Sequence, residues 1–60
     1  MSLTEKELNV IGEQIRAEKM LICKYKAYVL ICEDPELRQK CESIAGKHQT
    51  HFERLINFLN

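Results

Sequence analysis

The chain has 60 residues, of which 45% are hydrophobic, and its nine basic and nine acidic side chains cancel to a formal net charge of zero. A chain this short is expected to form one domain over residues 1–60, and such small domains usually need a disulfide, a metal or a partner subunit. The balanced charge gives no electrostatic reason to expect nucleic-acid binding, which needs clustered Lys and Arg, and it is equally weak evidence for binding at a membrane surface.

The first predicted helix covers about residues 4–32. Thr4 followed three residues later by Glu7 has the pattern of a capping box, which marks a helix start. Apolar residues then recur at steps of three and four, with position 18 completing the series: Leu8, Ile11, Ile15, Ile22, Tyr25, Val29 and Cys32. That rhythm is typical of closely packed, nearly parallel or antiparallel helices.

The turn follows directly. Asp34 is a preferred N-cap and Pro35 fits the first helical position, so a second helix is predicted to begin there. The residue before a proline is pushed out of the α region, and we expect the first helix to stop at about Glu33. A link of about two residues makes the two helices antiparallel.

The second predicted helix covers about residues 35–59. Its apolar series is completed by positions 48 and 51: Leu37, Cys41, Ile44, Leu55 and Phe58. Further apolar residues flank both series, and these stripes are wider than one partner helix can cover. The predicted fold is therefore an all-α antiparallel hairpin that dimerises into a ferritin-like four-helix bundle. Gly12 and Gly46 lie inside the helices, where close helix approach or simple tolerance would explain them.

Three cysteines, Cys23, Cys32 and Cys41, form no CxxC pair, and an odd number cannot close a disulfide framework within one chain. Reduced thiols in a cytoplasmic protein are the simpler interpretation. The first residues show no basic region followed by an apolar core, so no secretion signal is predicted. The uncharged run from residue 27 to 32 is too short to span a bilayer.

Three positions in the apolar series are polar: Glu18, His48 and His51. Counted from the turn at 1.5 Å per residue, all three lie roughly 22–26 Å away, with Glu18 between the two histidines in height. The sequence thus predicts one polar layer near the middle of the hairpin. A carboxylate with two imidazoles is a recognised ligand set for zinc or a non-haem iron-type metal.

A second interpretation of this layer needs no metal. The histidines can satisfy a buried Glu18 by hydrogen bonding, and such a layer can fix helix register and oligomeric state. Tyr25, seven residues after Glu18, is either a donor to the layer from outside the ligand set or ordinary core.

A mid-helix Glu, a Tyr seven residues later, a short turn and a two-ligand motif at i, i+3 resemble half of a ferritin-like four-helix bundle. More narrowly, Asp34-Pro35-Glu36-Leu37-Arg38-Gln39 and His48-Gln49-Thr50-His51-Phe52 resemble small proteins related to the spore coat F family of endospore-forming bacteria. By this resemblance Glu18 matches the first-helix carboxylate and His51 matches the histidine of Glu-x-x-His. His48 stands where that motif has Glu, which argues against a bridged two-iron site.

The resemblance implies a homodimer with a structural or interaction role, associated with the spore and with other spore proteins as partners. The alternative is a metal-binding protein that uses Glu18, His48 and His51 with zinc or iron. A redox enzyme is the least favoured function, because the carboxylate at position 48 is missing, and catalytic turnover is not expected.

Overall fold

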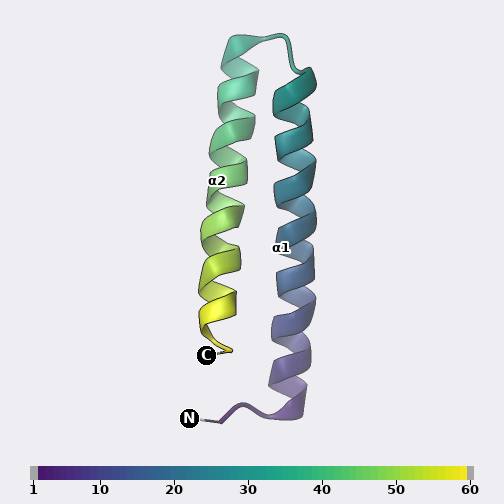
Figure 1. Ribbon diagram of the computed structural model, residues 1–60, viewed down its shortest axis with the longest axis vertical. Coiled ribbons are helices and arrows are strands. Elements are labelled where there is room, and N and C mark those ends of the chain that lie inside the picture. The colour runs from purple at the N-terminus through teal and green to yellow at the C-terminus, as the bar shows by residue number, and fades with distance from the viewer. Residues whose placement is uncertain (1, 60) are drawn as a thin grey trace.

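The chain folds into two long helices that run antiparallel, side by side (Figure 1). The computed structural model describes residues 2–59. Helix α1 spans Glu5–Ile31 and helix α2 spans Pro35–Asn57, and the hairpin measures 46 × 14 × 11 Å. The all-α hairpin predicted from the sequence is confirmed. Neither helix is long and apolar enough to cross a membrane.

The start of α1 is held by the predicted capping box. The Thr4 hydroxyl accepts a hydrogen bond from the Glu7 backbone N–H at 3.1 Å, and the Thr4 N–H donates to Glu7 Oε1 at 3.0 Å. These bonds satisfy two backbone donors that the first turn of a helix leaves free. Two hydrogen bonds with Thr4 lower the pKa of the Glu7 carboxylate from its usual 4.5. The bond to the Thr4 backbone has the larger effect, and the bond to its side chain the smaller.

The turn is organised from the second helix. Asp34 accepts hydrogen bonds from the N–H groups of Glu36 and Leu37, and Pro35 takes the first helical position as expected. Helix α1 ends at Ile31, one residue before the predicted end at about residue 32, so the link is three residues long rather than two. Cys32 and Asp34 both adopt extended backbone; the N-cap role and the following proline require this of Asp34, and Cys32 is the C-cap of α1.

Arg38 closes this turn by reaching back from α2. Its Nε and Nη2 donate to the Cys32 carbonyl at 3.1 and 3.0 Å, and Nη2 also reaches the Glu33 carbonyl at 3.4 Å. The last turn of α1 contains no basic residue. Arg38 therefore supplies from the other helix the positive charge that a helix C-terminus favours.

The core between the helices is thin. Three residues of the described chain are buried: Ile22 on α1, and Cys41 and Ala45 on α2. Most other apolar residues of the two series are half-buried, and nine large ones are exposed: Leu8, Val10, Met20, Tyr28, Leu30, Ile31, Leu37, Phe58 and Leu59. So many exposed large apolar side chains indicate an interaction surface.

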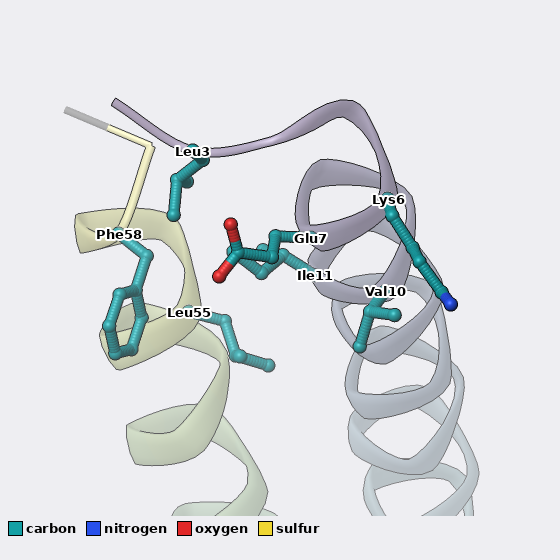
Figure 2. A pocket seen from close by; sticks show the side chains of 7 residues that line it. All are labelled: Leu3, Lys6, Glu7, Val10, Ile11, Leu55 and Phe58. Carbon is teal, nitrogen blue, oxygen red and sulfur yellow. The ribbon is translucent and has the colours of Figure 1, made fainter. Parts of the chain in front are cut away.

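One part of that surface is a hollow at the open end of the hairpin (Figure 2). Its walls come from both helices and from the segment before α1, with an empty volume of about 750 Å³: Leu3, Lys6, Glu7, Val10, Ile11, Leu55 and Phe58. Phe58 is 64% exposed although it is a large aromatic residue. The open end therefore leaves apolar side chains facing solvent.

The glycines do not mark a close approach of the helices. A Cβ added at Gly46 would meet nothing within 4 Å, and one at Gly12 would meet only Arg16 Nη1, at an ordinary 3.5 Å. The cysteines are all free, with Cys41 buried, Cys32 half-buried and Cys23 exposed. Cys41 thus serves as an apolar core residue, as its place in the series predicted.

Candidate metal centre

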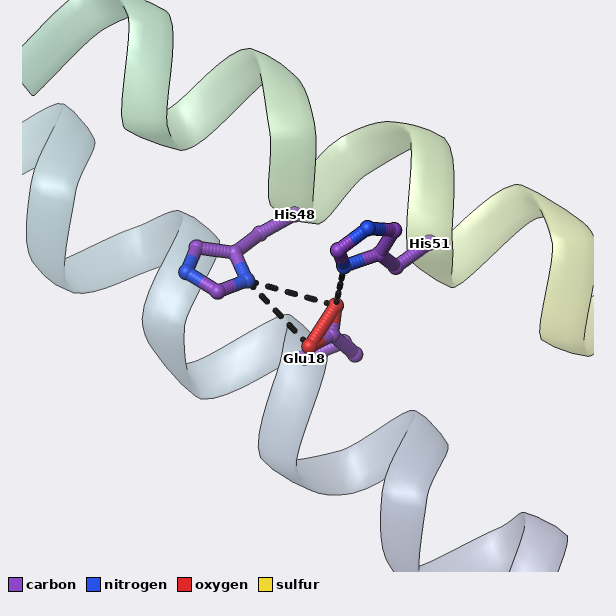
Figure 3. Close-up of side chains that lie close together, drawn as sticks. All are labelled: Glu18, His48 and His51. Atoms are coloured by element: carbon purple, nitrogen blue, oxygen red, sulfur yellow. Dashed lines mark hydrogen bonds and ion pairs between the residues drawn. The ribbon is translucent and has the colours of Figure 1, made fainter.

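Helix α1 presents Glu18 to α2 at mid-height, and α2 presents His48 and His51 back to it (Figure 3). His48 Nδ1 lies 3.2 Å from Glu18 Oε1 and 3.3 Å from Oε2. His51 Nδ1 lies 3.3 Å from Glu18 Oε2. The two histidines are three residues apart, which places them on one face of α2, so a single carboxylate contacts both.

Burial differs across the three side chains. Glu18 is 12% exposed, His48 is 22% exposed and His51 is 54% exposed. The carboxylate is thus the innermost group, although it belongs to a residue type that is almost never buried without a partner. Its two imidazole contacts supply that partnership, and His51 forms the outer edge of the group.

Tyr25 contributes through its ring. The ring lies 6.1 Å from that of His48, centroid to centroid, at an interplanar angle of 23°, which is a stacked arrangement. Tyr28 meets Tyr25 edge-on at 5.5 Å. Within residues 2–59 no hydrogen bond joins the Tyr25 hydroxyl to the three polar residues. Tyr25 therefore orients His48 by packing, and the hydroxyl donation considered from the sequence is not seen.

The spacing of the three groups suits a metal ion. One ligand atom from each residue can be chosen so that all lie within 4.8 Å of one another. In a tetrahedral zinc site with bonds of about 2.1 Å, neighbouring ligand atoms are about 3.4 Å apart. The contacts from Glu18 to the two histidines, 3.2 and 3.3 Å, are close to that separation. Small side-chain adjustments would therefore let the three groups hold one ion.

The group opens to solvent on one side. A shallow hollow with an empty volume of about 540 Å³ is lined by Glu18 and His51 together with Gln14, Arg54 and Leu55. The sequence interpretation missed Gln14 and Arg54. Helical spacing was the available signal, because Gln14 precedes Glu18 by four residues and Arg54 follows His51 by three. This opening offers an ion a route to Glu18 and His51.

Comparison with known proteins identifies no relative: no family model, no curated protein and no solved structure matches the chain. The resemblance to spore coat F-related proteins thus gains no support from these searches. The structure itself gives the two-helix hairpin and the convergence of Glu18, His48 and His51.

Proposed function

We propose that this protein binds a divalent transition metal ion, zinc or iron, through Glu18, His48 and His51, and that it does so as a homodimeric four-helix bundle. The observation that carries the proposal is that one carboxylate from α1 meets two imidazoles from α2, with one ligand atom from each residue lying within 4.8 Å of the others. These are the ligand types that such metals take in proteins.

The arrangement favours an ion over a purely hydrogen-bonded layer. Both histidines direct Nδ1 at the same carboxylate, at 3.2 and 3.3 Å, which is about the separation of neighbouring ligand atoms around one ion. Zinc sites that keep an open position use three protein ligands, with two His and one Glu among the known sets, and these three side chains supply that set. The proposal is limited to binding, since His48 replaces the second carboxylate of a bridged two-iron oxidase.

The dimer part rests on the thin core. A hairpin whose described residues bury only Ile22, Cys41 and Ala45 leaves most of its apolar surface in water. A second hairpin of the same kind would cover that surface and form a four-helix bundle.

Metal binding is tested on protein purified without a His-tag. Metal analysis and zinc titration should give about one ion per chain. Glu18→Gln and His51→Ala should each weaken binding by more than the roughly 10- to 100-fold typical of groups that merely support ligands. Glu42→Gln is the matched control, because Glu42 is an exposed carboxylate within a helix and outside the group of three. Metal-free protein that takes up no zinc, or equal affinity in all variants, refutes the proposal.

A metal-free structural or interaction module is the second candidate, and the exposed apolar residues favour it. It is the role implied by the resemblance to spore coat proteins. Protein that is dimeric, stable and indifferent to zinc would support this second function and exclude the first.

A further inference from the structure

Part of the exposed apolar surface, including Val10, Tyr28 and Phe58, lies along one side of the hairpin. Three hollows lie along it, and each is lined by both helices: the open-end hollow with Val10 and Phe58, the middle hollow with His51, and a turn-end hollow with Tyr28 and Ile44. The turn-end hollow is walled almost wholly by apolar side chains, with an empty volume of about 820 Å³.

Helical geometry places these hollows on the same side. On α1, Val10 and Tyr28 are 18 residues apart, which is five full turns. On α2, Ile44, His51 and Phe58 follow one another at seven-residue intervals, and the middle and open-end hollows share Leu55. We call this side, defined by the three hollows, the apolar face. The candidate metal centre opens onto it through His51.

The two long edges of the apolar face differ in charge. Along α2 the edge carries Lys40, Lys47 and Arg54 at seven-residue spacing, all exposed. The corresponding edge of α1 carries Val10, Ala17, Lys24 and Ile31, so three of its four positions are apolar. The exception is Lys24, whose ammonium lies 5.9 Å from the centre of the Tyr28 ring in the same chain. One edge is basic and the other is largely apolar.

This difference decides how two copies can pair. With turns at opposite ends, α2 lies along the second copy's α2. Bringing the polar layers into register then sets Lys47 of one copy within about a helical turn of Arg54 of the other. Like charges brought together oppose association. With turns at the same end, α2 lies along the apolar edge of the second copy's α1, over which lysine stems can pack.

We propose that the apolar face binds a second copy of this chain with both turns at the same end, about a twofold axis along the bundle. This rests on the proposed homodimer and adds its face and direction. The arrangement covers His51, now 54% exposed, and brings Arg54 of the second copy to the level of Glu13 and Gln14. The second copy thereby closes the open side of the metal centre.

Distances between spin labels test the direction. The variant Glu33→Cys carries a label in the turn, with Cys23→Ser and Cys32→Ser removing the accessible native thiols while Cys41 stays buried. The label leaves the Arg38 contacts in place, because they go to backbone carbonyls. The control is Lys19→Cys in the same background, since position 19 lies near the level of the polar layer and its distance changes little between the two arrangements.

Turns at the same end predict a distance of about 20 Å between the labels at position 33, roughly two helix spacings. A distance approaching the 46 Å length of the hairpin, with the control still near its expected value, overturns the proposed direction. Absence of coupling at both positions shows a monomer and overturns the dimer as well. Zinc binding is measured separately, so a short distance without zinc uptake would refute only the metal site.

Discussion

The polar layer lies where an apolar layer would stabilise the fold more, and this gives a quantitative test. In the variant with Glu18→Leu, His48→Leu and His51→Leu, we expect the metal-free protein to be more stable than the metal-free natural sequence. Glu18 and His48 are only 12% and 22% exposed, so folding removes most of their hydration. Their contacts at 3.2 and 3.3 Å share the single Nδ1 of His48 and together return about 1.5–3 kcal/mol at best.

Leucines at these positions would remove the desolvation cost of the polar groups and would bury apolar surface instead. Replacing a buried polar or ionic group with apolar residues is typically neutral or stabilising by up to about 4 kcal/mol, and we expect about 2 kcal/mol here. Zinc acts in the opposite sense. At a free concentration 1,000 times its dissociation constant, zinc should stabilise the natural sequence by about 4 kcal/mol and the leucine variant not at all.

The assay is urea unfolding followed by helical circular dichroism, with chelator or with zinc, at one protomer concentration because dimer stability depends on it. Glu42→Leu controls for the addition of a leucine, since Glu42 is exposed, lies off the apolar face, and its replacement should change stability by less than about 0.5 kcal/mol. A leucine variant less stable than the chelated natural protein by more than about 1 kcal/mol would refute this reasoning, because the layer would then hold the fold together by itself.

Three further predictions concern the helix ends and the glycines. Arg38→Ala should destabilise the hairpin by about 1–3 kcal/mol in urea unfolding through loss of the charged bonds to the Cys32 carbonyl, and Arg38→Lys should recover only part of that. Gly46→Ala should stabilise by about 0.5–1 kcal/mol in the same assay, since the added methyl meets open space; a loss would show that something packs there. Glu7, whose pKa is lowered by its bonds to Thr4, should favour the folded state above pH 4.5 and cease to do so as pH falls through its lowered pKa. Glu7→Gln should remove that part of the acid dependence, and an unchanged pH profile of stability would contradict the assignment.

The sequence predicted the hairpin because its signals are local. Thr4 with Glu7, and Asp34 with Pro35, determine the two helix starts through bonds within one turn, and both were found. The level of Glu18 relative to the histidines followed from the constant rise of a helix, and the contacts with His48 and His51 confirm that they share it.

Features that depend on contacts between the helices were not predictable in this way. The Arg38 bonds across the turn need the two helix ends to be placed in space, and nothing in the local pattern distinguishes Arg38 from a surface residue. The stacking of Tyr25 on His48 likewise depends on side-chain rotamers at the interface. The same holds for His51 being more exposed than His48, since both belong to one apolar series.

The proposed metal centre and the proposed dimer on the apolar face constrain each other. A polar layer weakens the contact between two helices, and this hairpin has only three buried residues among those described to offset it. A bound ion would stabilise the layer only at sufficient metal concentration, whereas the proposed second copy on the apolar face would add apolar burial at both ends and withdraw His51 from solvent. Dimerisation should therefore precede metal binding. We expect zinc affinity to fall when the protein is diluted below its dimer dissociation constant. A zinc affinity that stays constant across that range of protein concentration would show that metal binding does not depend on dimerisation.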